Sequence, residues 1–157
     1  MSPVRVGDGE AGTIEAGGRS WRIDSANGID DDSAGYHERH TDWMWSAGVG
    51  EDTAGRAVAW NLVSGINDPP QRSERAVWVD GEPHEPGPVE FEDLEAIAFD
   101  DGSRLEFQGE CERRKQQNLL LVRYSYRQPF GSFSGTLPGG LELEQGLGVM
   151  EHHDARW

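Results

Sequence analysis

The sequence has little of what several protein classes need. Its 157 residues include one cysteine, Cys111, so no intramolecular disulfide can form, and the Cys and His spacings of zinc modules are missing. No apolar run approaches the roughly 18 residues of a membrane span, and residues 1–12 lack the charged and apolar regions of a signal peptide. We therefore expect a reduced, cytoplasmic setting and no membrane partner.

Basic residues are also scarce. The chain has 14 Lys and Arg against 29 Asp and Glu, a net charge of −15, and its longest basic run is the triplet Arg113-Arg114-Lys115. A field of this sign repels phosphate backbones. We therefore expect no nucleic-acid partner, and we interpret the excess acid as a contribution to solubility.

Motifs of the common enzyme classes are missing as well. The chain has no G-x-S-x-G, no G-x-x-x-x-G-K-[ST], no G-x-G-x-x-G after a predicted strand and no H-E-x-x-H. Hydrolase triads, nucleotide hydrolysis and Rossmann cofactors lose support, and we expect no cofactor.

Period-two alternation is what the sequence has instead of helical periodicity. Trp43, Trp45, Ala47 and Val49 point one way and Asp42, Met44, Ser46 and Gly48 the other, as expected for a strand. Similar runs follow at 57–65, 76–79, 97–99, 104–111, 119–126, 131–137, 141–144 and 147–151. Turn pairs separate several of them, at Asp80-Gly81, Asp101-Gly102 and Gly139-Gly140.

These patterns predict an all-β fold, an antiparallel β-barrel of about nine or ten strands. Closure into a barrel is attractive because it leaves no free sheet edge. We expect a flexible N-terminus at residues 1–12 and a single domain at 13–157, which begins with a hairpin around Gly17-Gly18.

Some predicted strands are apolar on both faces. Val58, Trp60 and Leu62 alternate with the apolar Ala57 and Ala59, and the run 119–122 is likewise apolar throughout. Such strands need a cover on each side. A neighbouring sheet or an undetected helix would serve, but we favour a second copy of the chain and expect a homodimer.

The candidate catalytic residue is Glu151, which is in phase with Leu147 and Val149. If these face the interior, burial favours the protonated carboxyl and makes Glu151 a candidate proton donor. The alternative is a structural ion pair with an arginine, namely Arg19, Arg39, Arg123, Arg127 or Arg156.

Five further residues are candidates for ligand binding. Asn61 carries an amide in phase with small residues, which needs a polar partner in the protein or in a ligand. Aromatic side chains with a polar tip suit an amphipathic pocket, although they suit a dimer interface equally. The aromatic candidates are Trp43, Trp45, Trp78 and Tyr126.

Histidines suggest a weaker hypothesis of a metal site. His37 and His40 precede the first long strand, while His152 and His153 follow Glu151 near the end of the chain. They form a donor set only if the two segments meet, and no established ligand spacing is matched. We therefore predict no metal and keep these four as weak candidates.

Several blocks of the sequence resemble a family of uncharacterised bacterial proteins, many from actinobacteria. The blocks are TDWMWSAGVG (41–50), NLVSG (61–65), SERAVWVDG (73–81), QPFGSFSGTL (128–137) and GVMEHHDARW (148–157). That family looks like a relative of the lipocalin-like superfamily of hydroxyneurosporene synthase (carotenoid 1,2-hydratase), AttH-type proteins and tocopherol cyclase. The resemblance implies a lipocalin-like β-barrel. It covers only the C-terminal one of the two tandem barrels common in that superfamily, and a second copy would replace the other.

These observations lead to three functional hypotheses. The first is binding of an apolar or amphipathic small molecule in a barrel lumen. The second, implied by the resemblance, is a cofactor-independent hydratase, cyclase or isomerase that acts on an isoprenoid-like or polyketide-like substrate by acid catalysis through Glu151. The third is a packed barrel with a structural or interaction role.

Overall fold

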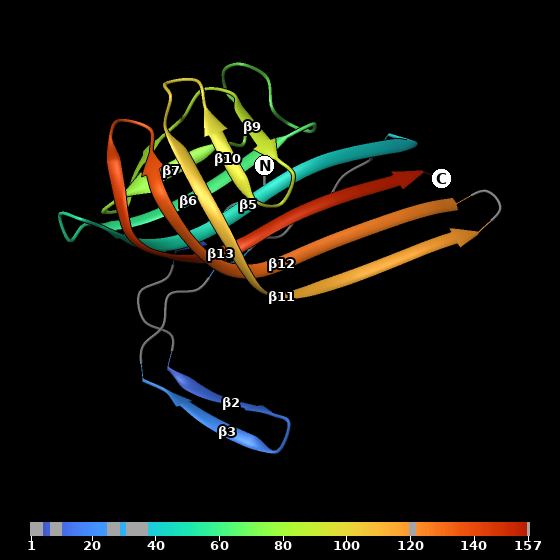
Figure 1. The fold of residues 1–157 in the computed structure, drawn as a ribbon, viewed down its shortest axis with the longest axis horizontal. Helices are drawn as coiled ribbons and strands as arrows, with labels where there is room; N and C mark the ends of the chain where they lie inside the picture. The colour runs from blue at the N-terminus through green and yellow to red at the C-terminus, as the bar shows by residue number, and fades with distance from the viewer. Residues whose placement is uncertain (1–4, 7–10, 25–28, 31–37, 120–121, 157) are drawn as a thin grey trace. The chain divides into compact units, whose positions relative to one another are not determined.

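The computed structural model describes residues 1–157 except positions 1–4, 7–10, 25–28, 31–37, 120–121 and 157 (Figure 1). Contacts divide the chain into two compact units, residues 1–33 and 34–157, where the sequence predicted one domain from residue 13. The predicted flexible segment 1–12 lies largely outside the described residues. Within the described part, no helix is long and apolar enough to cross a membrane.

The first unit contains two short antiparallel pairs. β1 (Arg5–Val6) pairs with β4 (Ile29–Asp30), and β2 (Gly12–Ala16) pairs with β3 (Arg19–Ile23). Gly17 and Gly18, with φ of 56° and 74°, connect β2 to β3. A two-residue turn with positive φ at both positions needs glycine or a similar residue, so the predicted hairpin is confirmed.

The second unit is one antiparallel sheet of nine strands in the order β8-β7-β6-β5-β13-β12-β11-β10-β9. This confirms the prediction of an all-β antiparallel fold. The strands are β5 (His40–Asp52), β6 (Ala57–Ser64), β7 (Ala76–Val79), β8 (Glu82–His84), β9 (Val89–Glu92), β10 (Ala96–Phe99), β11 (Arg104–Leu119), β12 (Val122–Leu137) and β13 (Leu141–Arg156).

Two of the predicted turn pairs have the backbone that tight hairpins need. Asp80 and Gly81 connect β7 to β8 with φ of 49° and 85°, and Gly139 and Gly140 connect β12 to β13 with φ of 80° and 74°. The predicted strand at 119–126 is different, because β11 ends at Leu119 and β12 begins at Val122. That run spans the connection between two strands.

The nine-stranded sheet curls into a half-barrel (Figure 1). β9, at one end of the strand order, contacts β6, which is third from the other end. Irregular pairing at Gly109/Cys111 in β11, at Phe133/Gly135 in β12 and at Leu143/Gln145 in β13 accompanies the curl. Such bulges bend a strand and increase its twist.

The inner face of the curl holds the hydrophobic core. Its members come from strands across the whole sheet, and the largest of them are fully buried: Trp60, Leu62, Ile97, Leu105, Leu137 and Met150. The indole Nε1 of Trp60 donates a hydrogen bond to Ser46 Oγ at 3.1 Å, and its ring meets Phe133 edge-on with the ring centroids 4.9 Å apart. We call the opposite side of the sheet the outer face.

Gly48 makes room for the Trp60 ring. A Cβ at this position would lie 2.0 Å from Cζ2 of Trp60, which no side chain tolerates without movement. A Cβ at Gly109, by contrast, would lie 3.5 Å and 3.6 Å from its nearest atoms, which is ordinary contact. An added methyl group would therefore clash with Trp60 at position 48 and meet only ordinary contacts at position 109.

We predict that Gly48→Ala lowers the free energy of unfolding by about 1–3 kcal/mol, because the fully buried Trp60 must shift. Gly109→Ala is the matched control and should change stability by less than about 0.5 kcal/mol. Urea unfolding followed by tryptophan fluorescence measures both variants. Equal stability of Gly48→Ala and wild type would show that Trp60 is not held in this position.

Candidate functional site

The residues predicted for the site lie on the outer face. Successive side chains of a strand alternate between faces, so Asn61 points away from the side that Trp60 occupies. Cross-strand pairing places Trp45 opposite Glu151 and Trp43 opposite His153 on that same outer face. We expected these side chains to line a lumen, but the inner face is filled by the core, and the sheet positions them on its other side.

Glu151 accepts hydrogen bonds from side chains of two neighbouring strands. Trp43 Nε1 of β5 donates to Oε1 at 3.2 Å, and Tyr126 OH and Gln128 Nε2 of β12 donate to Oε2 at 2.9 Å and 2.8 Å. Glu151 itself is only 9% exposed. We call Trp43, Tyr126, Gln128 and Glu151 the Glu151 cluster, and it unites three of the residues predicted from the sequence.

The donors of the cluster match an ionised carboxylate. Indole and amide N–H groups only donate, and the Tyr126 hydroxyl donates here too, so each of the three bonds offers a proton to Glu151. Such bonds compensate a carboxylate for the water it loses on burial. The cluster therefore suits a buried negative charge, and these three donors are neutral.

Aromatic rings surround the carboxylate. His153 stacks on Trp43 with ring centroids 3.8 Å apart, and Tyr124 stacks on Tyr126 at 6.2 Å. On the far side of the tyrosines, Lys115 Nζ lies 5.6 Å from the centroid of Tyr124 and Arg113 lies 5.9 Å from that of Tyr126. A negative charge and two cations thus lie on opposite sides of one aromatic pair.

Both tyrosines titrate above their usual range. Burial of the hydroxyl is the largest cause of the raised pKa of Tyr126, followed by the charge of Glu151 and the hydrogen bond to it. Burial also raises the pKa of Tyr124, again with a contribution from the charge of Glu151. Tyr126 therefore keeps its proton and remains a donor to Glu151 well above neutral pH.

A second polar pair connects β5 to β6 on the outer face. Trp45 Nε1 donates to Asn61 Oδ1 at 2.7 Å, and Asn61 Nδ2 donates to the backbone oxygen of Glu74 at 2.7 Å. Asn61 is 7% exposed, so these bonds satisfy an amide that is almost out of contact with water. From β5, Trp43 thus donates a hydrogen bond to Glu151 of β13, and Trp45 donates one to Asn61 of β6.

Trp78 is separate from these groups. It lies on β7 opposite Ala59, half-buried on the outer face, two strands away from Trp45. Gln128 is the member of the cluster that the sequence analysis missed. Gln128 has the same strand phase as Tyr126, so alternation places both side chains on one face. Its hydrogen bond to Glu151 depends on the register between β12 and β13, which alternation does not give.

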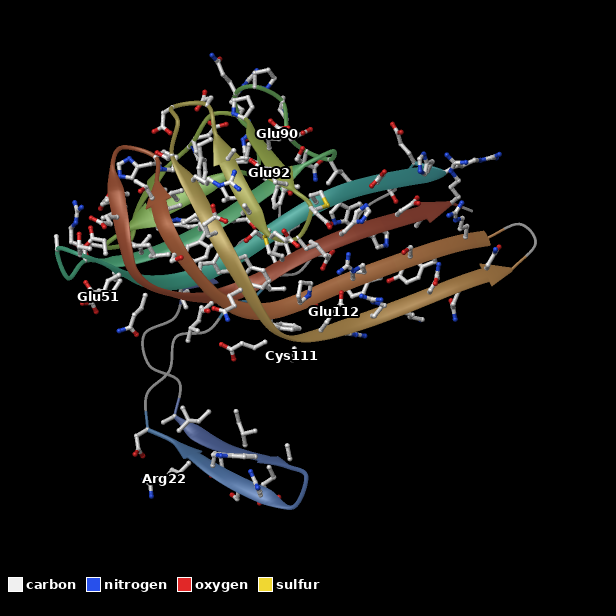
Figure 2. All side chains as sticks on the ribbon, viewed as in Figure 1. Arg22, Glu51, Glu90, Glu92, Cys111 and Glu112 are labelled. Carbon is white, nitrogen blue, oxygen red and sulfur yellow. The ribbon has the colours of Figure 1, made fainter. Side chains whose placement is uncertain are left out.

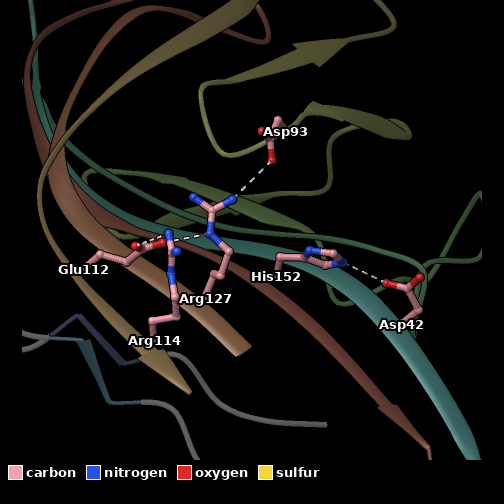
Figure 3. Close-up of polar contacts among 6 residues, drawn as sticks. All are labelled: Asp42, Asp93, Glu112, Arg114, Arg127 and His152. Carbon is pink, nitrogen blue, oxygen red and sulfur yellow. Dashed lines mark hydrogen bonds and ion pairs between the residues drawn. The ribbon is translucent and has the colours of Figure 1, made fainter. Parts of the chain in front are cut away.

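The histidines considered for a metal site have other partners. His40 Nε2 lies 3.1 Å from Asp154 Oδ1, and His152 Nε2 lies 3.0 Å from Asp42 Oδ1, as Figure 3 shows for the second pair. His153 is on the outer face against Trp43, and His37 lies outside the described residues. Among the residues that the structure describes, no group of three or more His, Cys, Asp or Glu side chains is placed to hold a metal ion.

The raised pKa of Tyr126 predicts a loss of stability at alkaline pH. Below the usual pKa of 10.0, the tyrosine is neutral in both the folded and the unfolded chain, so its contribution is fully present. Above pH 10.0 the unfolded chain ionises first, and that contribution is progressively lost.

We therefore expect the stability difference between wild type and Tyr126→Phe to shrink by about 1 kcal/mol between pH 9 and pH 11, after allowance for solvent screening. Urea unfolding of both proteins at each pH measures the difference. A constant difference at pH 8 and pH 9 is the internal control. A difference that stays constant up to pH 11, or grows, contradicts the raised pKa.

Comparison with known proteins gives one result for the family. No curated protein and no solved structure matches the chain. The model of a family described as a domain of unknown function, DUF2804, matches residues 9–157. Since the match covers nearly the whole sequence, the chain belongs to the DUF2804 family.

Proposed function

We propose that the protein binds an amphipathic small molecule on the outer face of its sheet. The polar end of the ligand meets the Glu151 cluster, and its apolar part lies along Val149, Phe130 and Leu147. The observation that carries the proposal is the buried Glu151 carboxylate, held by three neutral donors among aromatic rings. A carboxylate bordered by indole and phenol groups favours a hydroxyl or an ammonium as the polar end.

Exposed apolar side chains next to the cluster support this mode of binding. Leu147 and Phe130 are 62% and 43% exposed. Phe130 of β12 lies opposite Val149 of β13, which is buried. Glu151, Val149 and Leu147 are successive outer-face residues of β13, so they extend over about 14 Å. A medium-length alkyl chain would follow this row of side chains from the polar end.

This proposal differs from the two hypotheses based on a lumen or on acid catalysis. The inner face of the sheet is occupied by Trp60, Ile97, Leu105 and other core side chains, which leaves the outer face as the better candidate. Acid catalysis needs a protonated Glu151, whereas donors from three side chains favour the carboxylate. Binding is therefore the better supported function.

The wider relationship is also a proposal. We infer that the family is a distant relative of the lipocalin-like superfamily of hydroxyneurosporene synthase, AttH-type proteins and tocopherol cyclase. What supports it is the all-antiparallel sheet, in which most neighbouring strands are consecutive in the sequence and which curls around an apolar core. In that superfamily apolar ligands are expected, which agrees with the amphipathic ligand proposed here.

Three probes with the same chain and different polar ends test the proposal: octylamine, 1-octanol and octanoate, each titrated while tryptophan fluorescence is recorded. We expect octylamine and octanol to bind. Octanoate should bind at least tenfold more weakly, because its negative carboxylate is repelled by the carboxylate of Glu151. Glu151→Gln should weaken octylamine at least tenfold. Leu147→Ser should weaken both ligands severalfold.

Glu144→Gln is the matched control, since Glu144 is an exposed glutamate of the same strand. It should leave all three affinities unchanged. Leu147→Ser changes an exposed side chain and so keeps the test valid if Glu151→Gln does not fold. Failure of all three probes to bind, or binding that ignores both substitutions, would refute the proposed site.

A further inference from the structure

β11 has a long free edge. β10 pairs with it only from Arg104 to Glu106, and the last backbone bond on that side runs from Phe107 N to Glu95 O at 2.7 Å. From Gln108 onward, no strand among the described residues pairs with this edge of β11, although β12 pairs with the other edge as far as Leu119. A free edge presents unpaired N–H and C=O groups to a further strand.

Acidic residues come before basic residues along this edge, so a second copy that runs antiparallel to it places charges of opposite sign next to each other. Glu110 and Glu112 come first, and Arg113, Arg114 and Lys115 follow. All five are exposed. In a chain with a net charge of −15, this is a local stretch where basic residues outnumber acidic ones. Two copies of the protein therefore repel each other less at their β11 edges than the net charge alone would give.

We propose that two copies of this protein form a dimer by antiparallel pairing of their β11 edges. A two-fold axis normal to a sheet requires one residue to face its own copy, and we place Arg113 there. Glu112 then lies opposite Arg114 of the partner subunit, on both sides of the axis. Glu110 belongs to the β-bulge of β11 at Gly109/Cys111, so regular pairing across the axis extends from Cys111 to Lys115.

Side chains already gathered at Glu112 fit this arrangement. Arg114 and Arg127 both donate to the Glu112 carboxylate, at 2.7 Å and 2.8 Å, and Arg127 also lies 3.9 Å from Asp93 (Figure 3). This glutamate and its neighbour Cys111 lie where β11 bends (Figure 2). An arginine from the partner subunit would add a further hydrogen bond to the Glu112 carboxylate, which would then connect arginines of both copies in one network.

A groove next to the edge accommodates the end of the second strand. It is open, has a volume of about 690 Å³, and is lined by Leu94, Phe107 and Pro129 together with acidic residues such as Glu95 and Glu110. Gly109, Glu110 and Cys111, the residues of the bulge in β11, also line this groove. The end of the partner's β11 therefore leaves the regular ladder at this groove.

Charge exchange between Glu112 and Arg114 tests the register. Sedimentation equilibrium of the full chain should show a dimer, with Arg114→Glu and Glu112→Arg each weakening self-association at least tenfold. A mixture of the two variants should recover it, because every Glu then faces an Arg across the axis. Glu90→Arg, with the same charge change at an exposed residue of β9, is the control and should leave the dimer intact.

Two further substitutions probe the axis itself. Arg113→Gln should strengthen the dimer, because it removes like charges that face each other. Arg113→Cys in a Cys111→Ser background should form a disulfide between copies under mild oxidation, since facing Cα atoms lie about 4.5–5.5 Å apart. Cys111 alone should not, because it faces Lys115 of the partner subunit.

The outcomes separate this proposal from its competitors. A monomer at all concentrations, a dimer that Arg114→Glu leaves unchanged, or a variant mixture that does not associate would overturn it. A monomer that binds an acidic extended peptide at β11 would assign the edge to a different partner. A dimer broken by Leu147→Ser but not by Arg114→Glu would move the interface to the outer face.

Discussion

The packing of Trp60 inside the curl decides where everything else in the sheet lies. Its indole is fully buried, is hydrogen bonded to Ser46 and fits only above the bare backbone of Gly48. Because strand side chains alternate, Trp60 on the inner face requires Asn61 on the outer face. The register with β5 and β13 then places Trp45 and Glu151 beside it. The position of the candidate site follows from the choice of which apolar row forms the core.

The outer face shows how a sheet can hold a buried carboxylate through hydrogen bonds from neutral side chains. A carboxylate removed from water needs donors, and in Glu151 they include an indole, a phenol and an amide from β5 and β12. These bonds tie three strands together just beyond Met150, the last residue of β13 that belongs to the core. Farther along, the inner face carries exposed pairs such as His152–Asp42, and pairs of that kind contribute little. The Glu151 cluster therefore marks the boundary between the packed half-barrel and the extended parts of its longest strands.

Much of the fold could be predicted from the sequence because alternation and turn glycines are local signals. The antiparallel all-β class and the turns at Asp80-Gly81 and Gly139-Gly140 followed from them. The face of the site did not follow, because β6 is apolar on both sides and alternation alone cannot choose between a row with Trp60 and a row with Ala59. The length of β11 was also missed, since its second half is charged and has no apolar row. Trp43, Tyr126 and Glu151 were found by phase and polarity, whereas Gln128 required the pairing of distant strands.

The extended part of the sheet has a physical consequence for function. Beyond the core, the hairpin of β11 and β12 continues beside β13 and β5, and stacked tyrosines and ion pairs at Glu112 add to its backbone bonds. None of the core residues comes from this part of the sheet, and beyond Phe107 its outermost strand, β11, pairs on one side only among the described residues. The bonds from Tyr126 and Gln128 to Glu151 add to the backbone ladder that attaches β12 to β13. A molecule bound at Glu151 and a strand added to the edge of β11 would order the same hairpin from its two sides. Ligand binding and self-association are therefore expected to favour each other, because each reduces the conformational entropy that the other must overcome.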